Sequence, residues 1–461
     1  MKHINIKSQL AMFSVLLLIL TPILVFVGCV DSEPPEVECP DPLPIIHEFP
    51  IISIQTNYAD GDPTRFAGIN RTDWLRGSIS LSYNNPEFEF KDVPLDIRGR
   101  GNSSWNAFEG RKQPYRLRFL SGQNRTMLDS GYAARNWSIL AKHNDKTLLR
   151  DYTAFMLGRE LGNFSFVPFA RFVHVYINDE YRGVYILTDH MDTDGDRVNI
   201  NQSSDPALRE YYIEQCQRGE GIGFRIQSHP TLATANRNMW FEFRDDSGIN
   251  QEHIMYVRAF MQKVHDAIVS RDFDAISRVT DIDSMVDFYL VNEIFKDADI
   301  AWSSNHMTIR GTGENRRLHM GPLWDFDLSS GNAGGGGHVN LSPHGFLPEG
   351  RDLPTGAWMA HLHPWFYHLV HYTPEFRALV TARLYEIKTQ HLPTIVEKVT
   401  SLTDLYQEEF SRNFERWEIL GTNVWWNPPA IVALQTHEEH VQHFIDFLIS
   451  RAHWLYYTYL V

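Results

Sequence analysis

The sequence predicts an α+β fold of two lobes, in which a β-rich lobe containing one main helix precedes a mainly helical lobe. Three observations predict it. Apolar residues alternate with a period of two through much of residues 49–191. One segment there has helical spacing instead, and the helical period dominates from about Gln251 onward. A chain of 461 residues that is 43% hydrophobic can bury such a core.

The N-terminus predicts export. Two lysines precede an uncharged apolar run over residues 10–27, which ends at Gly28 and Cys29. A small residue followed by cysteine at this position favours a lipoprotein signal peptide over residues 1–29, with lipid attached to Cys29. We therefore expect a protein anchored by lipid to the bacterial cell envelope. An uncleaved membrane anchor is the alternative, because the run approaches the length of a membrane-spanning helix.

Residues 30–48 are acidic and rich in proline, which predicts an extended tether between the lipid and the first lobe. Cys39 and Cys216 could pair in an oxidising compartment or remain two separate thiols. The net charge of -15 argues against a nucleic-acid partner.

The first lobe, residues 49–191, is expected to be a sheet with one helix. Strands are predicted around residues 95–97, 115–119, 172–177 and 181–187, and the last two form a hairpin about Asn178 and Asp179. The helix should begin with Asn144 or Asp145 as its N-cap and end at Gly162. This is the outline of a small nucleotide-binding lobe.

The second lobe, residues 192–461, is expected to be mainly helical. Helices are predicted from Gln251 and over Met285–Phe295, and again from about Trp358 to the C-terminus. Between them, the Gly-, His- and Pro-rich residues 331–356 predict a long surface loop.

Carboxylates gather within residues 297–327 of the second lobe. Asp325 and Asp327 follow a predicted strand over residues 318–323, where oxygen ligands suit a hard cation such as Mg²⁺. Asp299 and Asn305 precede them. Phosphoryl transfer uses one carboxylate to orient the acceptor hydroxyl, and a carboxylate and an amide oxygen to hold metal. A solvated helix end and an ordinary turn would also explain these residues.

Cations concentrate in the first lobe, against the acidic average of the chain. They are Arg98, Arg100, Lys112, Arg116, Arg118, Lys142, Lys146 and Arg150. The glycines of the segment 98–105 would let backbone N–H groups approach an anion. A polyanionic ligand such as a nucleotide would explain this concentration, and so would an acidic partner protein.

Several separate motifs resemble the spore-coat protein H (CotH) family of kinase-like proteins. They are LDIRGRGNSSW (95–105), KQPYRLRF (112–119), NWSILAKHNDKTLLRDYTAFMLGRELG (136–162), VHVYINDEYRGVYILTDHM (173–191), RVNI (197–200), NEIFKDAD (292–299) and MGPLWDFDLSSGN (320–332). The resemblance implies an atypical protein-kinase-like fold of two lobes. It also implies phosphorylation of serine in a protein substrate, with ATP and Mg²⁺ (or Mn²⁺) as cofactors.

The resemblance also implies roles for the carboxylates. Asp299 would be the catalytic carboxylate, and Asp297 competes with it for this role. Asp325 would bind the metal, with Asn305 as a second ligand.

In the first lobe, the resemblance makes Lys112 the best candidate for the lysine that contacts phosphate, supported by Arg100 and Lys146. The segment Leu187–Met191, which includes Asp189, would be the hinge between the lobes, and its backbone would meet adenine.

Two other functions fit the same sequence. One is a surface binding or assembly protein on an inactive kinase-like scaffold, since a fold does not guarantee a chemistry. The other is a metal-dependent hydrolase that uses histidines of the second lobe, namely His338, His344, His361, His363, His368 and His371. Their spacing contains no His-Glu-x-x-His motif.

Overall fold

A computed structural model describes residues 49–56, 68–216, 221–227, 239–301, 303–334, 341–345 and 364–460. All of them belong to one compact unit, residues 46–461. The expected signal peptide, the tether, Cys39 and most of the loop 331–356 lie outside the described residues. In the part that is described, no helix is long and apolar enough to cross a membrane. Helices and strands are both abundant, so the predicted α+β class is confirmed.

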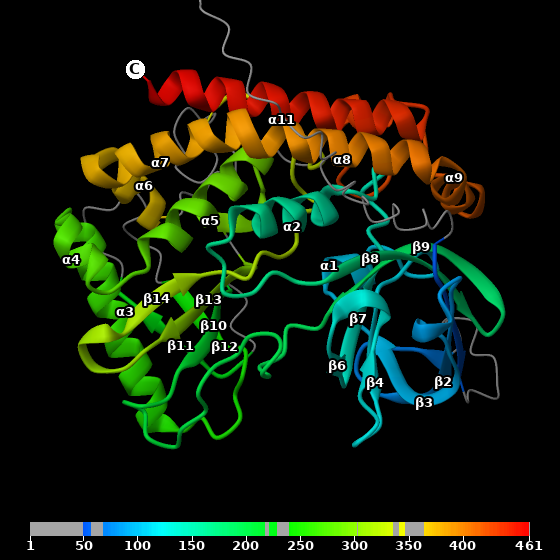
Figure 1. Cartoon of the computed structure of the whole chain (residues 1–461), viewed down its shortest axis with the longest axis horizontal. Coiled ribbons are helices and arrows are strands. Elements are labelled where there is room, and N and C mark those ends of the chain that lie inside the picture. The colour runs from blue at the N-terminus through cyan, green and yellow to red at the C-terminus, as the bar shows by residue number, and fades with distance from the viewer. Residues whose placement is uncertain are drawn as a thin grey trace, which may run out of the picture. The chain divides into compact units, whose positions relative to one another are not determined.

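Seven strands close into a barrel, coloured blue to cyan with β9 in green in Figure 1. They are β1 (Ile51–Thr56), β2 (Leu75–Ser82), β3 (Phe90–Gly99), β4 (Tyr115–Phe119), β7 (Asn136–Leu140), β8 (Ala170–Ile177) and β9 (Glu180–Asp189). The order around the barrel is β1-β2-β3-β4-β7-β9-β8, and β1 closes it by pairing in parallel with β8. Two short strands, β5 (Arg125–Thr126) and β6 (Ala133–Ala134), form a separate ladder.

The alternating residues of these strands explain the barrel. Ile52, Ile79, Leu95, Leu117 and Val175 all point into one apolar core, which takes every second residue of each strand. The expected hairpin of β8 and β9 is confirmed by their antiparallel pairing. Closure removes the free sheet edges that would otherwise present unpaired backbone groups.

The helix expected between Asn144 and Gly162, α2 (Arg150–Leu161), begins later than expected. Asp145 is not its N-cap: this carboxylate instead accepts hydrogen bonds from Thr147 N at 3.1 Å and from Arg150 N at 3.1 Å. The residues between β7 and α2 are thereby held in irregular backbone. The helix ends at Gly162, which has a φ of 80°, as predicted.

A second sheet has the order β11-β12-β10-β13-β14. Its strands are β10 (Tyr211–Gln215), β11 (Gly223–Ile226), β12 (Met239–Phe243), β13 (Asn305–Arg310) and β14 (Arg317–Met320). Only the last of these was predicted, with an end at residue 323, whereas the structure ends it at Met320. Strand β10 is buried at every position, so it lacks the alternation that reveals a half-exposed strand.

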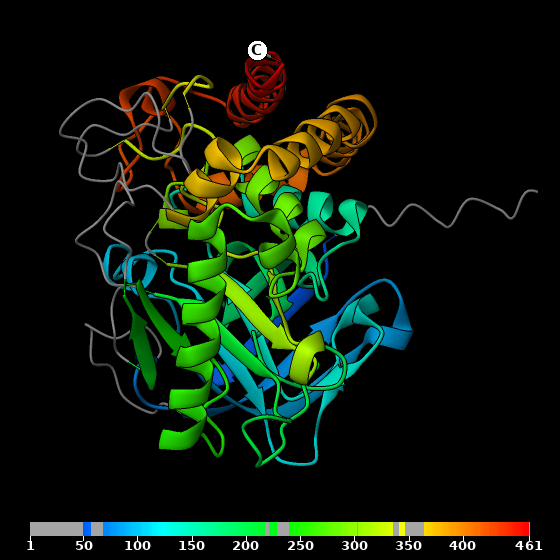
Figure 2. The same ribbon diagram turned by 90° about the vertical axis from the view of Figure 1, so that its left-hand side faces the viewer.

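The helices that follow cover this sheet and α2. They are α3 (Gln251–Ser270), α4 (Phe273–Ser277), α5 (Ile282–Phe295), α6 (Pro364–Tyr372), α7 (Pro374–Glu386), α8 (Leu392–Leu405), α9 (Gln407–Arg416), α10 (Pro429–Val432) and α11 (His437–Tyr459). Figure 1 shows α7, α8 and α11 lying across α5 and α2, and Figure 2 shows α3 running beside the second sheet. The predicted helices at Gln251 and over 285–295 are confirmed as α3 and α5.

Candidate functional site

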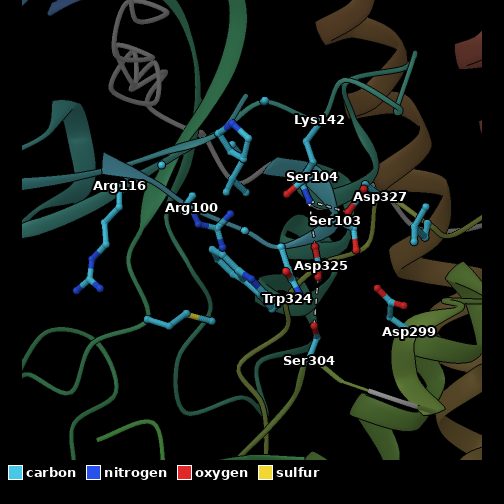
Figure 3. A pocket seen from close by; sticks show the side chains of 18 of the residues that line it. Arg100, Ser103, Ser104, Arg116, Lys142, Asp299, Ser304, Trp324, Asp325 and Asp327 are labelled. Carbon is cyan, nitrogen blue, oxygen red and sulfur yellow. Dashed lines mark hydrogen bonds and ion pairs between the residues drawn. The ribbon is translucent and has the colours of Figure 1, made fainter. Parts of the chain in front are cut away.

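A cavity of about 500 Å³ lies between the barrel and the second sheet. Its walls come from the connection between β3 and β4, from the residues just after β7 and β9, from the second sheet, and from the segment that follows β14. Figure 3 shows Asp325 and Asp327 of this cavity close to Lys142, with Asp299 standing apart from them. It therefore joins the two regions in which the sequence analysis placed functional residues.

Lys142 is the centre of the charged cluster at the cavity. Its Nζ lies 2.9 Å from Asp151 Oδ2, 2.9 Å from Asp327 Oδ1 and 3.4 Å from Asp325 Oδ1. Asp151 stands in the first turn of α2 and also accepts a hydrogen bond from Phe326 N at 3.1 Å. One buried carboxylate thus fixes both the lysine and the backbone between the two cavity aspartates.

The pKa values of this cluster follow from burial and from the contacts with Lys142. Burial opposes the charge of Lys142, but the three carboxylates raise its pKa well above the usual value. Burial also raises the pKa of Asp151, to about 7, although Lys142 pulls it down. Burial opposes ionisation of Asp327 too, but Lys142 and Asn144 hold its pKa at about 2. Lys142 and Asp327 are therefore the permanently charged pair.

Asp325 presents its carboxylate to the cavity, where the side chain is 40% exposed. Ser304 Oγ donates a hydrogen bond to Asp325 Oδ2 at 3.2 Å. Asp325, Ser304 and Lys142 all have left-handed backbone, with φ of 71°, 62° and 47°. Such conformations cost about 1–3 kcal/mol each in residues other than glycine, and they concentrate at functional sites. The surrounding contacts hold three strained residues together here.

The structure separates the two competing aspartates after α5. Asp299 begins a 3₁₀ turn, Asp299–Ala301, and lines the cavity. Asp297 is 2% exposed, does not line the cavity, and accepts a hydrogen bond from Asp299 N at 3.3 Å. Burial raises the pKa of Asp297 well above its usual value. Asp299 is thus the member of this pair that can meet a ligand.

Asn305 does not reach the cavity. It is buried at the start of β13, and its Nδ2 donates a hydrogen bond to the carbonyl of Ile300. Asn144 instead supplies an amide side chain that lines the cavity, and its Nδ2 donates a hydrogen bond to Asp327 Oδ2 at 2.9 Å.

The glycine-rich segment after β3, residues 100–104, forms one wall of the cavity, called its roof below. Arg100 N donates to Pro114 O at 3.1 Å, which fixes the turn. Gly101 has a φ of 78°, and a Cβ there would lie 2.2 Å from Ser104 Oγ. The Arg100 guanidinium lies over the Trp324 ring, 5.3 Å from its centre, so the structure brings Arg100 together with the segment that carries Asp325.

The structure does not bring Lys112 or Lys146 to the cavity. Lys112 is completely buried, with Nζ 5.1 Å from the centre of the Tyr185 ring, and no hydrogen-bond partner for Nζ occurs among the described residues. Lys146 donates from Nζ to Thr422 O at 2.6 Å. Neither lines the cavity. The lysine that does is Lys142, which the sequence analysis counted among the cations but did not single out.

Asp189 is part of a buried network at the end of β9. It accepts hydrogen bonds from Tyr132 OH at 2.6 Å, Arg197 Nε at 2.7 Å and Phe169 N at 2.8 Å. The side chain therefore fixes the end of β9 and does not line the cavity. The next two residues, His190 and Met191, do line it.

The second sheet contributes a wall that the sequence analysis missed. Glu214 Oε1 accepts a hydrogen bond from Ser304 N at 2.9 Å, and its Oε2 lies 3.3 Å from Arg244 Nη1. Glu214 and Ser304 thereby connect the second sheet to Asp325. No sequence signal pointed to Glu214, because the strand that carries it was not predicted.

The donor set at the cavity fits a cation only if a ligand shares it. Among the residues that the structure describes, no group of three or more His, Cys, Asp or Glu side chains is arranged to hold a metal ion. Magnesium commonly takes one or two carboxylates and completes its shell with water and phosphate oxygens. Asp299 and Asp325 can supply that smaller set. The described His344, His368 and His371 form no such group with other side chains, so the hydrolase hypothesis gains no support.

Comparison with protein families matches residues 97–455 to the family described as CotH kinase protein. The match covers more than three quarters of the chain and includes Lys142, Asp151, Asp299, Asp325 and Asp327. No curated protein matches the sequence.

Proposed function

Because this chain belongs to the CotH kinase protein family, we propose that it is a protein kinase that transfers a phosphoryl group from ATP to serine, with Mg²⁺ or Mn²⁺. The observation that carries the proposal is the ion pairing of Lys142 with Asp151, Asp325 and Asp327 at one cavity. In this proposal the barrel is the nucleotide lobe of an atypical two-lobed kinase, and residues 192–461 form the second lobe.

The order of elements supports this assignment. Protein kinases place a lysine on a strand, pair it with an acid on the next helix, and add an aspartate that holds metal. Here β7 leads to Lys142, the helix α2 supplies Asp151, and Asp325 follows β14. In this proposal Lys142 and Asp151 therefore form the lysine–acid pair that protein kinases use.

In this proposal the charged and polar residues of the cavity have separate roles in the reaction. Lys142, Arg100 and the backbone N–H groups near Gly101 bind phosphate oxygens and offset their charge. Asp325 would hold the cation, with water and phosphate oxygens completing its shell, and the cation would neutralise charge on the phosphates. Asn144 keeps Asp327 oriented toward Lys142.

The transfer itself needs one proton acceptor. Asp299 takes the proton of the serine hydroxyl while its oxygen forms a bond to the γ-phosphorus. The bond between that phosphorus and the bridging oxygen of ADP breaks, so the products are phosphoserine, ADP and a proton on Asp299. Lys142 and Arg100 stabilise the negative charge that moves to the leaving oxygen.

A direct assay tests the proposal. The full chain is incubated with Mg²⁺ or Mn²⁺ and labelled ATP, beside Asp325→Ala, Asp299→Ala and the control Asp446→Ala, whose residue is exposed on α11. We expect label in protein for the wild type and the control only. Absence of label from all four proteins, or equal label in all, contradicts the kinase assignment.

The proposed location is the outside of the cell, with lipid on Cys29 and residues 30–48 as a tether. Support comes from the sequence pattern alone. Cells that express the chain should incorporate labelled palmitate into it, and Cys29→Ala should abolish the incorporation. Incorporation that persists in Cys29→Ala contradicts the proposed anchor.

A second candidate is a surface binding or assembly protein on a kinase-like scaffold. It is favoured by one observation, namely that the Lys142 ammonium lies against both cavity aspartates and so offsets the charge that would attract a cation. Binding of a cell-surface partner that is unchanged in Asp325→Ala, together with absence of label transfer, would support this second function.

A further inference from the structure

The end of the cavity away from Asp325 is lined by arginine. Arg98 on β3 and Arg116 on β4 are direct cross-strand partners, and both line the cavity. Arg118 follows on the same face of β4. One tryptophan, Trp74, lies under all three guanidinium groups, at 4.5 Å from Arg98, 5.5 Å from Arg116 and 3.9 Å from Arg118. Cations are thus stacked against one ring within a strongly acidic chain.

The carboxylate near Arg118 does not neutralise the positive charge of the three arginines. Arg118 Nη2 lies 2.9 Å from Asp96 Oδ2, but the same carboxylate also binds Arg76 Nε at 2.7 Å. One negative charge is therefore shared by two positive ones.

The carboxylate near Arg116 makes only a longer contact with it, and its other partner, Arg197, also pairs with Asp189 at 2.7 Å. Arg116 Nη2 lies 3.6 Å from Asp192 Oδ1, while Asp192 Oδ2 lies 3.4 Å from Arg197 Nη1. For Arg98, no hydrogen bond or ion pair occurs anywhere in the described part of the chain, and Trp74 is its contact. The three arginines thus carry a positive charge that the described residues do not balance.

Burial makes this imbalance costly. The Nε atoms of Arg116 and Arg118 are buried, and neither has a hydrogen-bond partner among the described residues. Burial also lowers the pKa of Arg116, to about 10, against the attraction of Asp192. The side chains of Arg116 and Arg118 are 20% and 28% exposed, so these cations are partly buried, and a ligand that completes their hydrogen bonds would stabilise them.

The geometry points to a second oxyanion subsite at Arg98 and Arg116, which binds a phosphate or carboxylate group apart from the Lys142 cluster. Figure 3 shows Arg116 separated from Asp325 and Asp327 by Arg100 and Trp324. Two guanidinium groups side by side on neighbouring strands suit oxyanions, because each can donate two parallel hydrogen bonds. Stacking on Trp74 orders them before the ligand arrives.

The subsite can receive its oxyanion from two sources, and naming them rests on the proposed kinase function. The group belongs either to the phosphoryl donor, at the end away from the transferred phosphoryl group, or to an acidic residue of the acceptor polypeptide. The binding itself does not depend on phosphoryl transfer. It can therefore be measured without any reaction.

The first test measures binding of inorganic phosphate to the full chain without divalent metal, by ³¹P nuclear magnetic resonance titration. We expect Arg98→Gln/Arg116→Gln to raise the Kd for phosphate at least about tenfold, because charge-assisted hydrogen bonds are lost. The matched control is Arg225→Gln, since Arg225 also stacks on a tryptophan, 5.5 Å from the Trp240 ring, but does not line the cavity.

Wild-type phosphate affinity in the double variant, or absence of phosphate binding by the wild type, overturns the subsite. If the glutamine variant melts at a lower temperature than the wild type, Arg98→Lys and Arg116→Lys replace it. They keep the charge but lose the paired donors, so we expect a smaller increase in Kd. Failure of label transfer with phosphate binding intact would instead count against the proposed kinase function alone.

The second test separates the two sources by comparing the kinetics of Arg98→Gln/Arg116→Gln with those of the wild type. It uses labelled ATP and two serine peptides, one in which glutamate flanks the serine and one in which glutamine does. An increase in KM for ATP with both peptides assigns the oxyanion to the donor. An increase in KM for the glutamate peptide alone assigns it to the acceptor. Either result supports the subsite.

Discussion

Lys142 and Asp151 form a buried ion pair beneath the cavity, with Nζ and Oδ2 2.9 Å apart and side chains only 9% and 1% exposed. The pair joins the end of a barrel strand to the first turn of α2. Because Asp151 also binds the backbone at Phe326, the lysine, the helix and the segment of Asp325 form one mechanical unit.

Removal of the lysine should therefore destabilise the protein as well as inactivate it. Lys142→Met leaves Asp151 and Asp327 without their shared cation, and breaking a buried pair in this way costs about 3–5 kcal/mol. Urea unfolding measures the loss. The double variant Lys142→Met/Asp151→Asn should recover part of it, and a double variant that is less stable than the single one would contradict the coupling.

Stability should fall as the pH rises through neutrality because of Asp151. Its pKa is about 7 in the folded protein and near the ordinary aspartate value when unfolded, so the folded state binds more protons between these values. Unfolding free energies of the wild type and Asp151→Asn should therefore diverge from pH 8 to pH 6. The wild type should gain at least about 1.4 kcal/mol relative to the variant, the equivalent of one pKa unit. Buried histidines affect both proteins equally, so a constant difference would contradict the assignment.

Two glycines offer a matched test of the roof of the cavity. Gly101 and Gly110 both have positive φ, but a Cβ meets Ser104 Oγ at 2.2 Å at Gly101 and no atom within 4 Å at Gly110. Gly101→Ala must displace the Ser104 hydroxyl, which lines the cavity, so we expect it to weaken ATP binding more than Gly110→Ala does.

Gly110→Ala carries only the left-handed strain, about 1–2 kcal/mol of stability. The shift in melting temperature produced by ATP and Mg²⁺ measures binding in both variants. Equal shifts in the two variants would mean that the roof does not contact the nucleotide.

The two aspartates after α5 should differ in their response to amide substitution. Asp299→Asn removes a proton acceptor at the cavity, so label transfer from ATP should fall at least about a hundredfold while the melting temperature stays unchanged. Asp297 is buried with a raised pKa, so Asn replaces a neutral carboxyl at little cost, and its Oδ1 can still accept from Asp299 N. Label transfer by Asp297→Asn should stay within about tenfold of the wild type, and a larger loss than in Asp299→Asn would reverse the two roles.

Local patterns predicted much of the barrel but not its closure. In strands such as β3 and β4, apolar and polar residues alternate because one face is buried, and this alternation can be recognised in the sequence. The parallel pairing of Ile52 with Val175 joins residues far apart in the chain, and no local pattern encodes such a partner. The second sheet was missed for a different reason, since uniformly buried strands such as β10 show no period.

The residues of the candidate site were likewise predictable only in part. Asp299, Asp325 and Arg100 stand in recognisable motifs, and the structure places all three at the cavity. Lys112 precedes a predicted strand and Lys142 precedes the predicted helix, and only tertiary packing decides that the first is buried beside Tyr185 and the second reaches the carboxylates. Glu214 acts through a backbone contact with Ser304, and a side chain of that kind leaves no pattern in the sequence.

Strand β1 pairs with a neighbouring strand on both edges, and this determines how the protein resists a mechanical pull. A pull on the chain ahead of Phe49 reaches β1 first, where all six residues pair with β2 and four of them also pair with β8. Force along this strand acts in shear, so the two ladders must yield together rather than open one bond at a time. If lipid holds the N-terminus, drag on the rest of the protein would be borne by β1 before any strain reached the cavity.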